Sequence, residues 1–160
     1  MYYFNPEAVT KRKAIERCRK LEPPHNCNFH ESCSLTFLLS IETKVEQDYI
    51  TENMIPLSPN WRCPFSGLIW LGGVYNRKTA EWYWEAPHLP AHLENKIKDN
   101  DHRHRLNVGF SFWGRALDMS VVVKARSKMC IKLFPTDNYS WTFGRCDLYH
   151  ASICEIKRYY

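Results

Sequence analysis

The sequence predicts an α+β fold, in which two helices pack beside a largely antiparallel sheet. Both helical patterns lie in the first third of the chain, and the remainder consists of short apolar stretches between polar ones. Helices followed by strands distinguish this order from the alternating order of an α/β protein. Seven cysteines, nine prolines and only six glycines are typical of a loop-rich domain held by disulfides. At 160 residues, without an internal repeat or a low-complexity linker, we expect a single domain over residues 1–160.

The first helix is predicted from Thr10 to Glu22. Thr10 is a suitable N-cap, and Pro23-Pro24 ends the pattern. Apolar residues recur at helical spacing with Lys and Arg between them: Ala14, Ile15, Cys18 and Leu21.

A buried strand over residues 34–41 and a second helix near residues 43–53 follow. Thr43 and Glu46 form a capping box, and Val45, Tyr49 and Ile50 give the expected apolar face of that helix. The remaining apolar stretches are predicted as strands of the sheet: Leu68–Leu71, Val121–Val123, Met129–Leu133 and Ser152–Ile156.

Composition and motifs exclude several classes of function. The net charge is +5, but no block of like charges and no recognition-helix pattern supports nucleic-acid binding. No apolar stretch reaches the roughly 18 residues that span a bilayer. Because nucleophile-elbow, zinc-protease and phosphate-loop motifs are absent, we expect no enzymatic activity and no cofactor.

The compartment follows from two opposing observations. The first residues lack the basic and apolar regions of a secretory signal, so Met1 begins either a cytosolic protein or a mature fragment or expressed domain. No C-x-x-C pair provides the usual zinc or redox spacing, which makes disulfides the better interpretation of the cysteines. We therefore expect a secreted or extracellular domain, which includes the ectodomain of a longer precursor.

Several motifs, in order, resemble the C-type lectin-like domain. Leu39–Ile50 resembles the family stretch from the second strand into the second helix, and Lys11 stands where the family usually has Trp. The other motifs that carry the resemblance are Tyr2-Tyr3-Phe4, Ala14 with Cys18, Ile69-Trp70-Leu71-Gly72-Gly73, Trp82-Tyr83-Trp84, and Trp141 with Cys130, Cys146 and Cys154. The resemblance covers nearly the whole chain and implies a divergent member with the C-type lectin-like fold.

The resemblance implies the disulfides Cys18–Cys154 and Cys130–Cys146. Three further cysteines have no counterpart in the family pattern. Cys27 and Cys33 are close enough in sequence to close a small loop. Cys63 is then left over, either as a buried free thiol or as an interchain disulfide that links a dimer.

The resemblance also locates the usual calcium and sugar site, which this chain lacks. The family's W-N-D motif reads Trp141-Thr142-Phe143, and neither Glu-Pro-Asn nor Gln-Pro-Asp occurs. Phe143 has no oxygen to offer calcium, and Thr142 offers only a hydroxyl. We therefore expect no metal site of the usual kind and calcium-independent binding.

The long loop from Glu85 to Val108 is the candidate ligand-binding region. Its acidic and amide residues are interpreted as solvated loop in preference to another cation site: Glu94, Asn95, Asp99, Asn100 and Asp101. A zinc site is likewise considered less favourable than a polar loop, because no obvious third ligand accompanies the loop's histidines: His88, His92, His102 and His104. The candidate ligand-binding residues are Lys96, Lys98, Arg103, Arg105 and Trp113.

Two functions remain open for this loop: recognition of a protein ligand, and recognition of an anionic glycan through its basic and aromatic residues. Strand alternation predicts that Phe110 and Phe112 are buried and that Trp113, on the other face, keeps some exposure. Asn138-Tyr139-Ser140 is a glycosylation sequon on the side where the family binds ligands.

Overall fold

The computed structural model describes residues 1–21, 33–55, 67–85, 110–114, 117–118 and 120–159. Within these residues the sheet has seven strands in the order β1-β7-β3-β5-β6, with β2 on β7 and β4 on β3. The strands are β1 (Tyr2–Val9), β2 (Cys33–Leu38), β3 (Ile69–Asn76), β4 (Glu81–Trp84), β5 (Met129–Phe134), β6 (Ser140–Arg145) and β7 (His150–Tyr159). The predicted α+β fold is confirmed.

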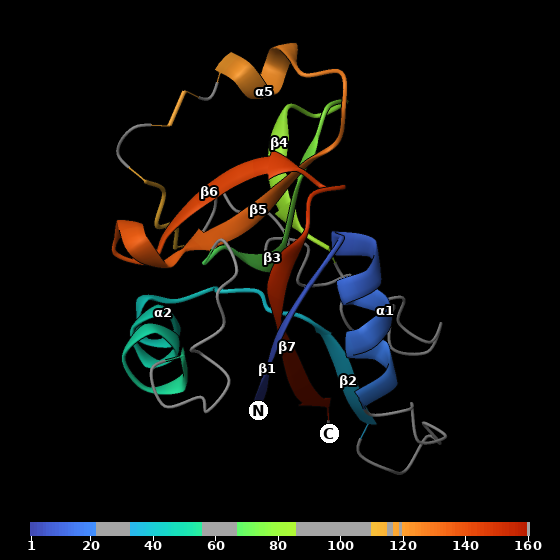
Figure 1. Ribbon diagram of the computed structural model, residues 1–160, viewed down its shortest axis with the longest axis vertical. Helices are drawn as coiled ribbons and strands as arrows, with labels where there is room; N and C mark the ends of the chain where they lie inside the picture. Colours follow the sequence, from blue (N-terminus) through green and yellow to red (C-terminus); the bar gives the residue numbers. More distant parts are fainter. Residues whose placement is uncertain (22–32, 56–66, 86–109, 115–116, 119, 160) are drawn as a thin grey trace.

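Strand β7 joins the two halves of the sheet, as Figure 1 shows. It pairs antiparallel with β1 and β2, and its first residues pair parallel with Ile69 and Trp70 of β3. Every other pairing between the described strands is antiparallel. The parallel pairing connects the half that contains both termini to the half formed by β3, β4, β5 and β6.

Helix α1 (Lys11–Leu21) packs beside β2 and β7. Thr10 caps it as predicted: its carbonyl accepts a hydrogen bond from the N–H of Ala14 and its Oγ1 one from the N–H of Lys13. Cys18 on the buried face forms a disulfide with Cys154 of β7. This bond attaches the first helix to the strand at the centre of the sheet.

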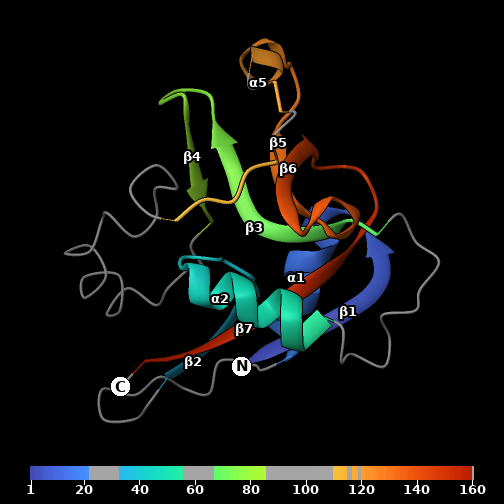
Figure 2. The same cartoon turned by 90° about the vertical axis from the view of Figure 1, so that its left-hand side faces the viewer.

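Helix α2 (Lys44–Tyr49) continues into η1 (Ile50–Met54), a π-helical turn. Figure 2 shows α2 across the front of the domain. Thr43 Oγ1 accepts from the N–H of Glu46, while Glu46 Oε2 accepts from the N–H of Glu42, one residue before the N-cap. The predicted cap is therefore present in a slightly shifted form.

The predicted apolar face of α2 is wrong in part. Ile50 is buried, but Val45 is 79% exposed and Tyr49 is 49% exposed. The buried residue is Gln47, whose Oε1 accepts from Trp141 Nε1 and whose Nε2 donates to the carbonyl of Tyr139. Because a buried amide is acceptable in a core once its polar atoms are paired, these two bonds determine which face of the helix is buried.

Val121–Val123 is helical, which corrects the predicted strand. These residues form most of α5 (Ser120–Lys124). The side chain of Asp118 accepts from the N–H of Ser120, and its carbonyl accepts from the N–H of Val121. This local turn begins the helix, and the helix places Val122 in the core. The run of valines suggested a buried strand because valine favours strands, but here it lies in a short helix.

Two hydrophobic clusters form the core of the described residues. One includes Trp84, Ile131 and Trp141, and the other includes Trp70, Val74 and the disulfide residues Cys130 and Cys154. Trp70 Nε1 donates to the carbonyl of Val9, which ties β3 to the end of β1. Burial continues from the end of β2 into the segment that follows it, at Phe37, Leu38 and Leu39.

Candidate ligand-binding site

The long loop lies between two parts of the chain that the structure describes. Glu85 precedes residues 86–109 and Phe110 follows them. Lys96, Lys98, Arg103 and Arg105 therefore lie outside the described residues, together with the loop's histidines and its other acidic residues. Their proposed roles remain predictions, and the site is built here from the residues on either side of that loop.

An aromatic cluster, defined here as Tyr75, Trp82, Trp113 and Phe143, joins β3, β4, β6 and the segment that follows the loop in sequence. Trp82 is its centre: its ring centroid lies 5.1 Å from those of Tyr75 and Trp113 and 5.6 Å from that of Phe143. Trp82 is buried, whereas the other three are partly buried. Aromatic rings at these separations attract one another beyond the effect of burial alone.

Trp113 keeps some exposure, as predicted, but the predicted contrast with a buried Phe110 and Phe112 is absent. Phe110, Phe112 and Trp113 are all partly buried, and Ser111 is the exposed residue of this segment. Trp113 packs against Trp82 and Trp141, because the segment attaches to β6 through hydrogen bonds between backbone groups of residues 112–114 and Trp141. Trp113 thus contributes one edge of the aromatic cluster instead of standing free.

Phe143 occupies the place where the resemblance locates a calcium-ligating carboxylate. Alternation along β6 directs Phe143 to the same face as Trp141, against Trp82. Thr142 lies on the other face, where it pairs with Lys132 of β5. Within the described part of the chain, no three His, Cys, Asp or Glu residues gather in a way that could hold a metal ion.

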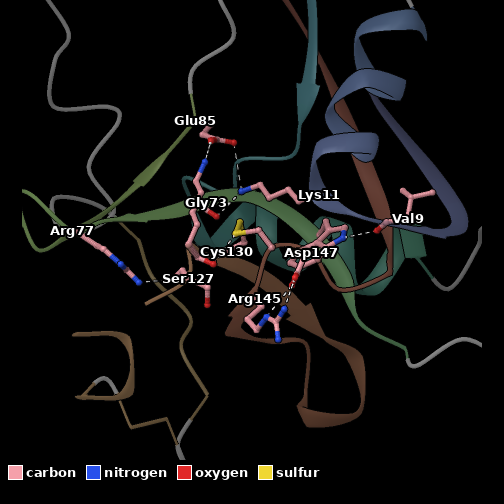
Figure 3. The surroundings of a disulfide bond; sticks show 12 residues. Val9, Lys11, Gly73, Arg77, Glu85, Ser127, Cys130, Arg145 and Asp147 are labelled. Carbon is pink, nitrogen blue, oxygen red and sulfur yellow. Dashed lines mark hydrogen bonds and ion pairs between the residues drawn. A yellow bond between two sulfur atoms is a disulfide. The ribbon is translucent and has the colours of Figure 1, made fainter. Parts of the chain in front are cut away.

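Lys11 connects α1 to the entrance of the long loop, as Figure 3 shows. Only 2% of this residue is exposed. Its Nζ donates to the carbonyl of Gly73 at 2.8 Å and lies 3.6 Å from Glu85 Oε2. Glu85 Oε1 accepts from Lys128 Nζ at 2.9 Å. The residue that begins the long loop is thereby held by one cation from α1 and one from the segment before β5.

The charges in this network shift each other's ionisation. Burial lowers the pKa of Lys11 to about 7, against the opposing effect of Glu85. Burial also opposes the ionisation of Glu85, but Lys11 and Lys128 outweigh it and hold the pKa of Glu85 below its usual value. The sequence signal for this network is Lys11, which stands where the family usually has tryptophan. The sequence could not identify Gly73 and Glu85 as its partners, because both are distant from Lys11 along the chain.

The two disulfides that the resemblance implies are present. Cys18 and Cys154 are 136 residues apart in sequence, and Cys130 and Cys146 are 16 apart. The second bond links β5 to the turn after β6, beside Lys11, whose backbone N–H donates to the carbonyl of Cys146. Cys27 and Cys63 lie outside the described residues, so the expectations for Cys27–Cys33 and for Cys63 remain predictions.

The sequon residue Asn138 is exposed, in the turn between η4 (Pro135–Asp137) and β6. Its φ of 51° is left-handed, a conformation that asparagine tolerates better than most residues. Ser140, the sequon hydroxyl, is buried and donates to Asp137 Oδ2. Glycosylation at Asn138 remains a prediction, on a turn that presents this residue to solvent.

No protein-family model and no curated protein matches the sequence. Solved structures of C-type lectin-like domains match over nearly the whole chain. Human lithostathine has a TM-score of 0.62 and 18% identity, covering 99% of this chain and 91% of that one. The C-type lectin CEL-I from Cucumaria echinata has a TM-score of 0.63 and 15% identity, covering 98% of this chain and 89% of that one. A calcium-independent type II antifreeze protein has a TM-score of 0.57 and 18% identity, covering 98% of this chain and 84% of that one.

These similarities, with the topology and both disulfides, establish that the chain has the C-type lectin-like fold. The identities are too low to transfer a ligand from any of these proteins. None of the helices described here is both long and apolar enough to span a membrane.

Proposed function

We propose that this domain is an extracellular recognition module that binds a protein ligand without calcium, through the long loop and the adjacent aromatic cluster. The observation that carries the calcium-independent part is the packing of Phe143 against Trp82. Calcium prefers six to eight oxygen ligands, and a phenyl ring in this position supplies none. The fold supports a binding role, since the solved structures that share it include a lectin and an antifreeze protein.

The aromatic cluster supports a protein ligand. Trp113 and Phe143 keep part of their rings exposed, and aromatic side chains are enriched at the centres of protein interfaces. Catalysis is not proposed, because the chain lacks the motifs of nucleophilic and metal-dependent hydrolysis. The two disulfides support an oxidising, extracellular compartment.

A glycan array probed in millimolar calcium and again in chelator tests the proposed mode of binding. We expect no signal that requires calcium. Reproducible binding in calcium that chelator abolishes would contradict the proposal, because it would require a calcium-dependent sugar site despite Phe143.

An anionic glycan is the second candidate ligand, bound through Lys96, Lys98, Arg103, Arg105 and Trp113. Basic residues near the aromatic cluster favour it, since the β3–β4 hairpin and α5, which carry Arg77 and Lys124, lie at the same end of the domain. Below about pH 6.5, protonation of the loop residues His92, His102 and His104 adds positive charge. Binding to an anionic ligand through the loop is therefore expected to strengthen as the pH falls toward about 5.5.

We expect the double variant R103E/R105E to fold normally and to lose loop-mediated binding to an anionic glycan. Exposed substitutions usually change the free energy of unfolding by no more than about 0.5 kcal/mol. Heparin affinity at pH 7 and at pH 5.5, measured beside thermal unfolding, checks both expectations. Unchanged heparin binding by the folded variant, with unchanged pH dependence, would remove the long loop from anion recognition.

Cys63 is proposed to form an interchain disulfide, which would make the module a covalent dimer. The expected result is a dimer band on a non-reducing gel that disappears on reduction and is missing in C63S. A wild-type chain that migrates as a monomer, with Cys63 alkylated before reduction, would show a free thiol instead.

A further inference from the structure

A cavity at the β3–β4 hairpin has a chemistry that the long loop does not explain. It is an open depression of the surface with a volume of about 490 Å³. The described residues that line it are Tyr75, Asn76, Arg77, Lys78, Tyr83 and Lys128. Three of these are cations, the others are an amide and two phenols, and none of them is acidic.

Arg77 attaches the hairpin to the segment that leads into β5. Its Nη2 donates to the carbonyl of Ser127 at 2.7 Å and also to that of Ala125. These bonds fix the guanidinium and hold the hairpin beside Lys128, which is distant from Arg77 in sequence. Among the described residues, Nε and Nη1 of Arg77 have no hydrogen-bond partner, so they remain as donors.

The neighbouring donors are also oriented. Asn76 Oδ1 accepts from the N–H of Lys78, which stabilises the turn and leaves the amide nitrogen of Asn76 as a donor. Lys128 Nζ is held 2.9 Å from Glu85 Oε1, and Glu85 is shared with Lys11. The ammonium of Lys128 is thus positioned but incompletely neutralised, and its side chain is 57% exposed.

The charge around this cavity is positive overall. The hairpin and the segment from α5 to β5 carry five cations: Arg77, Lys78, Lys124, Arg126 and Lys128. The acidic residues of the hairpin and its end are Glu81 and Glu85. Lys124 and Arg126 are exposed beyond the cavity itself, so the positive surface continues past its rim.

We propose that this hairpin cavity binds sulfated polysaccharide, with Arg77, Lys78 and Lys128 contacting sulfate and carboxylate groups. The set of hydrogen-bond donors fits oxyanions, and the planar guanidinium of Arg77 fits them in particular. Tyr75 and Tyr83 supply ring faces and hydroxyls that suit a sugar ring better than a bare ion. Cations that continue beyond the cavity match a polymer that carries repeated negative charges. This site rests on the domain being a binding module, and its one contact with the long loop is that of Lys128 with Glu85, the first residue of the loop.

Heparin binding by the double variant K78E/K128E tests the proposal. The matched control is R19E/K20E, which makes the same change in net charge at two exposed residues on α1. We expect K78E/K128E to weaken heparin binding by roughly tenfold or more at physiological salt, and R19E/K20E to change it by less than about threefold. Thermal unfolding of both variants confirms that they fold. K78E alone leaves the contact between Lys128 and Glu85 intact and is also expected to weaken heparin binding.

Further measurements distinguish the hairpin cavity from net charge and from the long loop. Completely desulfated heparin is expected to bind weakly, because it lacks the sulfate groups that Arg77, Lys78 and Lys128 are proposed to contact. Equal losses in both double variants would attribute binding to net charge and overturn the proposal. Heparin binding that is lost in R103E/R105E but kept in K78E/K128E would assign the glycan to the long loop and also overturn it. Neither result affects calcium-independent recognition of a protein.

Discussion

Replacing Cys18 and Cys154 together by alanine is expected to lower the free energy of unfolding by about 5 kcal/mol in the chain-entropy description. The bond closes a loop whose ends are 136 residues apart in sequence, so it restricts nearly the whole unfolded chain. Both residues are buried, and truncating their side chains also leaves unfilled space between α1 and β7. Because total stabilities are commonly about 5–15 kcal/mol, this variant should be close to unfolded at about 37 °C.

The double variant C130A/C146A is the matched control. Its loop has a sequence separation of only 16, for which the same description gives about 3 kcal/mol. Urea unfolding of both variants and the wild type, followed by tryptophan fluorescence, measures the two losses. A larger loss for C130A/C146A would contradict the central role assigned to the link between α1 and β7.

The free energy of unfolding is expected to rise by about 2 kcal/mol between pH 7 and pH 9 because of Lys11. Burial lowers the pKa of Lys11 in the folded state to about 7, while the unfolded chain retains the ordinary value of about 10.4. Between these values the unfolded state binds more protons than the folded state, so raising the pH favours folding. The full increase in the free energy of unfolding is reached only above the pKa of Lys11 in the unfolded chain. None of this increase remains once the pH has fallen below the pKa of Lys11 in the folded state.

The variant K11M tests this assignment, because methionine has a similar length and does not titrate. We expect its free energy of unfolding to change little between pH 7 and pH 9, as measured by urea unfolding at each pH. A rise in K11M equal to that of the wild type would show that another group is responsible. Above about pH 10 a decline is expected in both proteins, since burial and the hydrogen bond to Glu46 raise the pKa of Tyr2 well above its ordinary value.

Local sequence signals predicted those parts of the fold that depend on neighbouring residues. Thr10 and Thr43 cap helices as their sequence context indicates, because capping requires only residues within one helical turn. Val45 and Gln47 show where such reasoning fails. Their exposure depends on Trp141, which is 94 residues away from Gln47 and provides the partner that makes the buried amide acceptable.

In the candidate site, too, the features that depend on contacts between distant residues could not be predicted from the sequence. The resemblance alone places Phe143 where the family has a calcium ligand, so this part of the argument needs only one position of the sequence, and the loss of calcium binding remains a prediction. The hairpin cavity could not be predicted, because Arg77 and Lys128 become neighbours only through the pairing of β3 with β5 and the bonds from Arg77 to Ala125 and Ser127. The partial burial of Trp113 likewise depends on its packing against β6.

Thermal unfolding with and without calcium tests calcium-independent recognition most directly. An ion that binds only the folded state stabilises it by about 2.7 kcal/mol at a hundredfold excess over its dissociation constant, which raises the melting temperature. Since Phe143 packs on Trp82 and Thr142 pairs with Lys132, we expect the same melting temperature in millimolar calcium and in chelator. A clear upward shift in calcium, reversed by chelator and not reproduced by magnesium, would contradict calcium-independent recognition.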